Sequence, residues 1–204
     1  MRLGIMGGTF DPIHYGHLFV AEEARARFGL EKVLFLPNAH PPHKKAYPVT
    51  EARHRYDMAQ LAIRDNAAFE CSPLELQRPG PSYTVDTLAA LRAERPGAEL
   101  YYITGMDAIA EILTWNRPQE VIQMATFIAA ARPGFDSMEW MAALPNDYRA
   151  RILLLGSTAL GISSTDIRQR IATGLPVRYL TPDEVLDYIQ RHRLYRDGPG
   201  SEDS

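Results

Sequence analysis

The sequence of 204 residues has one cysteine, no long apolar run and no excess of positive charge. A single cysteine excludes an internal disulfide framework and suits a reducing compartment. No apolar run approaches the ~20 residues that a membrane-spanning helix needs. We expect no signal peptide at the start of the chain, because strand-like residues start at Leu3. We therefore expect a cytoplasmic protein with no membrane partner.

The charge balance also limits the partners of the chain. Its 22 basic and 25 acidic side chains give a formal net charge of −3 at pH 7. A dedicated nucleic-acid-binding protein is usually clearly basic. We therefore expect no nucleic acid partner, and any phosphate site must be local.

Two common phosphate-binding patterns are missing, the Walker pattern G-x-x-x-x-G-K-[ST] and the dinucleotide pattern G-x-G-x-x-G. A different glycine-rich stretch, residues 7–17, follows the apolar run Leu3–Met6 and precedes the amphipathic stretch Leu18–Phe28. This order predicts a turn from a buried strand into a helix. Backbone N–H groups can approach an anion there, and the helix N-terminus adds partial positive charge.

Two histidines in this stretch, His14 and His17, stand three residues apart around Gly16. Both imidazoles can therefore face one ligand near the helix start, and we interpret the stretch as a polyphosphate site. A zinc site completed by His40 and His43 is the alternative. Its spacing differs from the common Cys/His patterns, and the chain has a single thiol.

Apolar strands alternate with helices along the rest of the chain, which predicts one α/β domain over residues 1–196 with a parallel sheet. The expected strands after the first are Val33–Leu36, Glu99–Thr104, Thr126–Ala131 and Ile152–Leu155. Phe69–Leu76 is interpreted as a strand pair or a sheet edge. The Gly/Ser/Asp-rich end, residues 197–204, is predicted to be a disordered tail.

Polar clusters follow each of the five strands. Ligands of an open parallel sheet bind outside the carboxyl ends of its strands, so we expect these clusters to converge on one crevice, although the strand order is not readable. The clusters are 7–17, His43–Lys44, Gly105–Asp107, Arg132–Gly134 and Ile162–Arg168.

Hydroxyl residues predict the helix starts. The expected N-caps are Thr50, Ser82 or Thr84, Ser163 and Thr181. Ser163 forms a capping box with Asp166, and Arg168 lies one turn further on, on the face of Thr165. A helix start of this composition is also a suitable phosphate clamp, because a guanidinium binds two oxygens. Capping alone, with a surface ion pair for Arg168, is the alternative.

Other positions keep two interpretations at this stage. The proline-rich loop 38–48 is a solvated basic loop or an arm that brings Lys44 over a phosphate. Asp107 accepts from a ribose hydroxyl or caps the helix that follows it. Trp115 is a core residue or a face for stacking on an aromatic ring. Arg53 and Arg55 are expected to be solvated or paired.

The string 7–17, with its His-x-Gly-His ending, resembles the HxGH nucleotidyltransferase superfamily, and Ile162–Thr165 with Arg168 is similar to its second signature. The resemblance implies a Rossmann-like fold with helices on both faces of a parallel sheet. It also implies transfer of a nucleotidyl group from a nucleoside triphosphate to a phosphate. The implied catalytic residues are His14, His17, Lys44 and Arg168.

Intermediate motifs narrow the resemblance to bacterial nicotinate-nucleotide adenylyltransferases. These motifs are Pro41–Lys44, residues 78–88, Gly105–Asp107, Trp115, Arg132–Gly134 and residues 179–182. The implied reaction joins ATP and nicotinate mononucleotide into nicotinate adenine dinucleotide, with release of pyrophosphate. Mg²⁺ would enter with ATP, with no protein ligand assigned. The usual Gly-Ala-Asp triplet has Met106 in its centre here, which could reshape the adenosine side.

The resemblance also assigns the binding positions. Those for ATP are Gly8, Thr9, Phe10, His14, Gly16, His17, Lys44, Gly105, Asp107, Ile162, Ser163, Ser164, Thr165 and Arg168. Those for the mononucleotide are Thr9, Asp11, Lys44, Ser82, Tyr83, Thr84, Trp115 and Arg132. Alternative acceptors are nicotinamide mononucleotide and phosphopantetheine, and a non-catalytic nucleotide sensor is the alternative from another class. The sequence leaves a homo-oligomer open.

Overall fold

A computed structural model of the chain describes residues 1–40, 49–130, 141–156 and 160–196. At its centre is a six-stranded sheet in which all neighbouring strands are parallel, in the order β3-β2-β1-β4-β5-β6. The strands are β1 (Arg2–Gly8), β2 (Lys32–Pro37), β3 (Phe69–Cys71), β4 (Glu99–Gly105), β5 (Thr126–Ala130) and β6 (Ile152–Leu155). The predicted parallel α/β fold is confirmed. The predicted tail, residues 197–204, lies outside the described residues.

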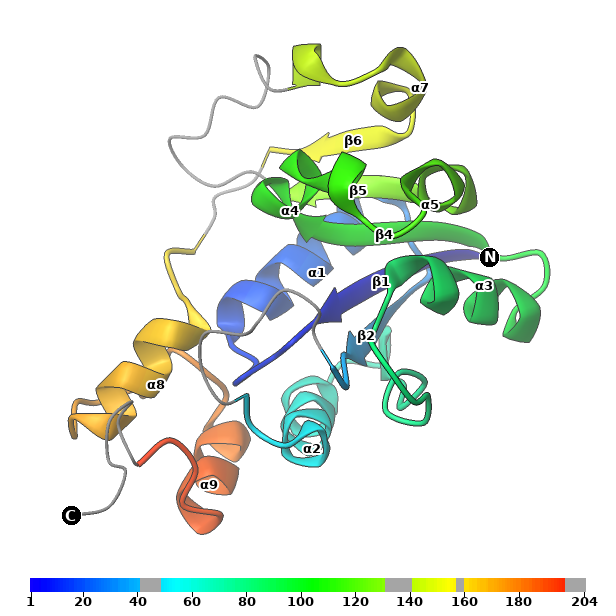
Figure 1. Cartoon of the computed structure of the whole chain (residues 1–204). Helices are drawn as coiled ribbons and strands as arrows, with labels where there is room; N and C mark the ends of the chain where they lie inside the picture. Colours follow the sequence, from blue (N-terminus) through cyan, green and yellow to red (C-terminus); the bar gives the residue numbers. More distant parts are fainter. Residues whose placement is uncertain (41–48, 131–140, 157–159, 197–204) are drawn as a thin grey trace.

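Helices cover both faces of the sheet (Figure 1). They are α1 (Tyr15–Phe28), α2 (Ala52–Ile63), α3 (Thr84–Glu94), α4 (Met106–Ala110), α5 (Pro118–Met124), α7 (Asn146–Arg149), α8 (Ser164–Ala172) and α9 (Asp183–Arg191), with a 3₁₀ helix at Ile112–Thr114. None of the helices within the described residues has the length and apolarity needed to cross a membrane.

The interior strands are apolar on both sides because each side contributes to a separate core. Along β2, Leu34 and Leu36 belong to the core under α3 and α5, whereas Val33 and Phe35 belong to the core under α1, α2 and α9. Successive side chains of a strand point to opposite faces. A strand covered on both faces therefore reads as a continuous apolar run, as in Val33–Leu36.

The order of the strands fixes the location of the ligand crevice. From β1 the chain proceeds outward to β2 and β3, then returns to the other side of β1 and proceeds to β4, β5 and β6. The direction of winding therefore reverses between β1 and β4. In open parallel sheets ligands bind at this reversal, outside the carboxyl ends of the strands. The carboxyl end of β1 leads directly into residues 9–14 and α1 (Figure 1).

Three predicted helix caps are wrong, and one is confirmed. The N-cap residues of α2, α3 and α9 are Glu51, Tyr83 and Pro182. The hydroxyls expected there have other partners, as in Thr181, which donates to the Ile13 carbonyl at 2.8 Å. Ser163 does cap α8, because its hydroxyl accepts from the Asp166 N–H at 3.1 Å.

Phe69–Leu76 provides one edge strand, β3, rather than a strand pair. Phe69–Cys71 pairs in parallel with Val33–Phe35 of β2, and none of the described residues beyond Ser72 in this segment bonds to β2. The residues that follow turn back toward α3, and this turn brings Glu75 to the crevice described below.

Candidate active site

Gly7, near the end of β1, and Gly16, in the first turn of α1, each have an aromatic ring close to the backbone. A Cβ atom on Gly7 would lie 2.5 Å from the Tyr102 hydroxyl oxygen, and one on Gly16 would lie 3.0 Å from Nδ1 of His14. Real Cβ atoms are not found at the first distance, so an alanine at position 7 would force Tyr102 to move. The glycines of this stretch therefore leave room for neighbouring side chains as well as for an anion that approaches the backbone.

The turn holds His14 and His17 against each other. Their rings are stacked, with centroids 3.7 Å apart and an interplanar angle of 22°. The backbone N–H of His14 donates to Nδ1 of His17 at 3.2 Å, so in the neutral ring the proton resides on Nε2. The edge of the Phe10 ring contacts His17 at a centroid distance of 5.1 Å. His17 therefore has a fixed orientation and tautomer, with its N–H on the side away from its own backbone.

Helix α8 is docked on the same turn. Arg168 donates from Nη1 to the Asp11 carbonyl at 2.7 Å, and Ser164 donates from its hydroxyl to the Pro12 carbonyl at 2.9 Å. The second guanidinium nitrogen of Arg168 lies 3.4 Å from the Thr165 hydroxyl oxygen. The structure thus brings the start of α8, a stretch far away in the sequence, to the two histidines.

The carboxylate of Asp11 is occupied by protein groups. Its side chain is 1% exposed, accepts from the Tyr195 hydroxyl at 2.7 Å and lies 3.4 Å from the Thr50 N–H. Burial, together with the Asp11 charge, raises the pKa of Tyr195, so this hydroxyl keeps its proton and donates. Asp11 ties Tyr195 to the turn, and its assignment to the mononucleotide stays a prediction.

A cleft of about 800 Å³ opens at the carboxyl ends of β1 and β4. It contains six of the predicted binding residues, from both the ATP set and the mononucleotide set. They are Gly8, Ser82, Tyr83, Thr84, Asp107 and Trp115. The other predicted residues among those described, apart from Gly105 at the N-cap of α4, belong to the turn after β1 and to the start of α8. Of the described clusters, residues 7–17 and 105–107 both contribute lining residues to the cleft. The start of α8 is bonded to the turn after β1, but neither it nor the two histidines line the cleft, so convergence of all the clusters on one crevice stays a prediction.

Trp115 packs against the core and also borders the cleft, so both of its predicted environments are present. Its ring packs edge-on against Tyr102 and Phe127, each at a centroid distance of 6.2 Å, and the half-buried residue also lines the cleft. Burial raises the pKa of Tyr102 to about 12, so its hydroxyl stays neutral. The tryptophan ring is thereby held by core residues and borders the space in which a ligand ring would lie.

Asp107 and Met106 lie in different environments although they are neighbours. Asp107 is exposed and lines the cleft, with its carboxylate next to Gly105. The Met106 side chain is 1% exposed and belongs to the core. The expectation that Met106 could reshape the adenosine side is therefore not met by the structure, because its side chain points into the core.

Arg55, which the sequence predicts to be solvated or paired, is a buried residue that joins three segments of the chain. It is 1% exposed and donates to the carbonyls of Thr50, Thr9 and Ala39 at 2.7, 2.8 and 3.2 Å. One buried guanidinium thus joins the ends of β1 and β2 to the segment before α2. The spacing of Arg55 from Met58 and Ala59, both buried, was a sequence signal for an inward-facing position.

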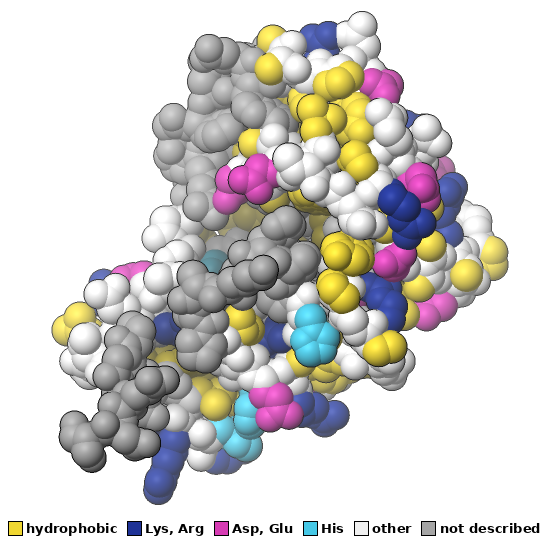
Figure 2. Space-filling view, viewed as in Figure 1, with side chains coloured by type: hydrophobic (Ala, Val, Ile, Leu, Met, Phe, Trp, Pro, Cys, Tyr) yellow, Lys and Arg dark blue, Asp and Glu magenta, His cyan; other side chains and the backbone are white. Residues whose placement is uncertain are grey.

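Several predicted features lie outside the described residues or find no support within them. Lys44, Arg132 and His43 are not among the described residues. Within those that are, no group of three or more His, Cys, Asp or Glu side chains is arranged to hold a metal ion. On the face shown in Figure 2, basic and acidic side chains are interspersed.

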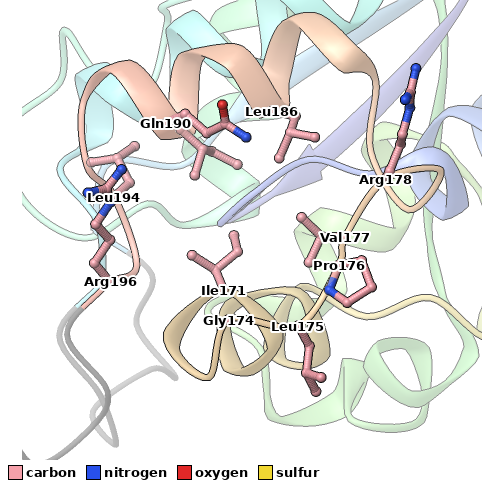
Figure 3. Close-up of a pocket in the computed structure, with 11 residues that line it drawn as sticks. Ile171, Gly174, Leu175, Pro176, Val177, Arg178, Leu186, Gln190, Leu194 and Arg196 are labelled. Atoms are coloured by element: carbon pink, nitrogen blue, oxygen red, sulfur yellow. The ribbon is translucent and has the colours of Figure 1, made fainter.

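A second cavity, of about 420 Å³, lies between α8 and α9 and has a mainly apolar lining, including Ile171, Val177 and Leu186 (Figure 3). Arg178 and Arg196 lie toward opposite ends of this cavity (Figure 3). None of the predicted catalytic or binding residues that the structure describes lines it.

Comparison with known proteins identifies close relatives of this sequence. A family model described as cytidylyltransferase-like matches residues 5–170. A "Probable nicotinate-nucleotide adenylyltransferase" of Desulfitobacterium hafniense (strain Y51) is 52% identical, and the alignment covers 96% of each chain. The protein of the same name from Moorella thermoacetica is 53% identical, with 96% of this chain and 92% of the relative covered.

Solved structures share the fold. A Plasmodium falciparum nicotinic acid mononucleotide adenylyltransferase complexed with NaAD superposes with a TM-score of 0.79, covering 97% of this chain and 98% of that one. The same enzyme complexed with APC gives a TM-score of 0.77. Sequence identity to both is 21%, so these similarities concern the fold.

Proposed function

Because this chain belongs to the family of nicotinate-nucleotide adenylyltransferases, within the cytidylyltransferase-like proteins, we propose that it transfers the adenylyl group of ATP to nicotinate mononucleotide. The products are nicotinate adenine dinucleotide and pyrophosphate, which places the reaction in NAD biosynthesis. Full-length similarity at about half of all positions supports this assignment.

One observation in the structure supports the proposal most directly. The stacked pair His14 and His17 lies at the end of β1, with Arg168 bonded to the same turn and the cleft opening between β1 and β4. A triphosphate at the turn and an adenosine near Asp107 would leave the Trp115 end of the cleft for the mononucleotide. The two substrates would then meet at the histidines.

The proposed reaction is an in-line displacement by the phosphate of the mononucleotide at the α-phosphorus of ATP. The nucleophile is already an anion at neutral pH, because a phosphate monoester has a second pKa of ~6, so no general base is required. Catalysis then consists of positioning and of stabilising the charge that develops at the α-phosphorus and on the leaving pyrophosphate. His17 is proposed to donate from Nε2, and Arg168, which is bonded to the turn after β1, is proposed to supply a guanidinium. Lys44 is proposed to act on the same phosphates.

The described residues offer no carboxylate cluster for a dedicated metal site. This donor set fits a Mg²⁺ ion that arrives with ATP, since Mg²⁺ keeps several waters and binds largely through substrate phosphates. When bound, Mg²⁺ neutralises charge on the triphosphate. Asp107, exposed in the cleft, is proposed to accept from the ribose of ATP, and Thr84 and Trp115 are proposed to contact the mononucleotide.

Product analysis tests the proposed function. We expect incubation with MgATP and nicotinate mononucleotide to give one nicotinate adenine dinucleotide for each pyrophosphate released, measured by chromatography with mass detection. ATP binding without any dinucleotide would favour the nucleotide sensor. Release of ADP or of inorganic phosphate in place of pyrophosphate would contradict adenylyl transfer.

A further inference from the structure

A buried carboxylate borders the cleft and is not used by the proposed mechanism. Glu75 is 6% exposed and lines the cleft together with Ser82, Tyr83 and Thr84. A buried ionisable group is costly unless hydrogen bonds satisfy it. The partners of this carboxylate therefore indicate what it does.

Two hydroxyl groups, one from each end of a short turn, donate to Glu75. Thr87 lies in the first turn of α3 and donates to Oε1 of Glu75 at 2.7 Å. The side chain of Ser82, just before α3, forms the second hydrogen bond. Burial raises the pKa of Glu75, whereas these two hydrogen bonds and the Arg78 guanidinium act in the opposite direction. Arg78 also donates to the Thr87 hydroxyl at 3.0 Å.

Ser82 extends this arrangement to the end of β2. Its hydroxyl oxygen accepts from the N–H groups of Ala39 and His40 at 3.2 and 3.4 Å, and its own N–H donates to the His40 carbonyl at 3.1 Å. A serine hydroxyl has one hydrogen and two acceptor sites. Because both acceptor sites are used, only the hydroxyl hydrogen is left for the interaction with Glu75.

We propose that Glu75 is a positioning residue for the acceptor mononucleotide, because its buried carboxylate fixes the turn Ser82–Thr87 that presents Tyr83 and Thr84 to the cleft. This inference rests on the proposed function, since it concerns the subsite assigned there to the mononucleotide. Without the hydrogen bonds to Glu75, the turn Ser82–Thr87 no longer holds the start of α3 at a fixed distance from the end of β2. Acceptor binding then weakens, and ATP binding does not.

The variant Glu75→Gln tests this proposal. The glutamine side chain has nearly the same volume, and its oxygen still accepts from Thr87. Its NH₂ group faces the hydroxyl hydrogen of Ser82. Two donors cannot bond to each other, so the hydrogen bond to Ser82 is lost. We expect the KM for nicotinate mononucleotide to rise about tenfold, while the KM for ATP changes less than twofold. A glutamate of the same cleft, Glu111, is exposed and provides the matched control, because Glu111→Gln removes the same charge without touching the turn.

Thr87→Val removes the other hydroxyl donor with little change in shape. It is the second test variant and keeps the proposal testable if Glu75→Gln folds poorly. If the two residues act as one clamp, the double variant raises the KM for the mononucleotide no more than the larger of the single changes. An unchanged KM for the mononucleotide in either variant, or equal increases for both substrates, would overturn the proposal. The wild-type chain distinguishes this failure from failure of the proposed function, because in the latter case it forms no dinucleotide at all.

Discussion

The two histidines of the first turn show how far spacing alone can predict a site. His14 and His17 are three positions apart, and that spacing at a helix start places both rings on one side. The stacked rings at 3.7 Å confirm the prediction that they lie together. The spacing of Arg55 from Met58 and Ala59 indicates an inward-facing position, but it does not identify the three carbonyls that the guanidinium contacts. Glu75 has no such local signal, because its partner Thr87 is 12 residues away.

Substitution of His17 separates its proposed catalytic role from its structural one. His17→Ala is expected to lower kcat by about 10²-fold or more with a modest change in the KM for ATP. His17→Asn keeps an acceptor for the His14 N–H but lacks the Nε2 donor. We expect it to lose the same activity while unfolding at nearly the wild-type temperature. Steady-state kinetics with a thermal melt measure both, and a change in kcat below threefold would refute the assigned role.

At the scale of the elements, the starts of helices were predicted less well than their existence. Thr50, Thr84 and Thr181 have the right side chains for N-caps, yet the caps fall one residue away from each. Thr181 bonds instead to the Ile13 carbonyl, a partner that only the folded chain provides. Ser163 was predicted correctly because its partner, the Asp166 N–H, is three residues away. Local partners are readable from a sequence, and distant ones are not.

Arg55 on α2 gives an element-scale prediction. Arg55→Met leaves three carbonyls without their charged donor, so we expect a loss of about 3 kcal/mol in the free energy of unfolding. Arg53, two residues earlier, is 73% exposed and pairs with Asp57 at the surface. Arg53→Met is therefore expected to cost less than about 1 kcal/mol. Urea titration measures the free energy of unfolding of both variants. Equal losses would show that the buried hydrogen bonds of Arg55 stabilise the fold no more than the surface ion pair of Arg53.

At the scale of the whole molecule, the sequence predicts a parallel sheet with its ligand crevice at the strand ends, and the structure adds the order of the strands. The order β3-β2-β1-β4-β5-β6 places the reversal of winding between β1 and β4, where the cleft lies. Apolar runs such as Val33–Leu36 show that a strand is buried but not which strand is next to it. The docking of α8 and of Tyr195 on the turn after β1 likewise depends on contacts across more than 150 residues.

The preference between two acceptors tests the central claim most directly. We would measure kcat/KM with MgATP for nicotinate mononucleotide and for nicotinamide mononucleotide, by following pyrophosphate release. The assignment predicts a ratio of at least ~10 in favour of the nicotinate compound, which corresponds to ~1.4 kcal/mol of transition-state discrimination. A ratio near one, or a preference for the nicotinamide compound, would contradict it.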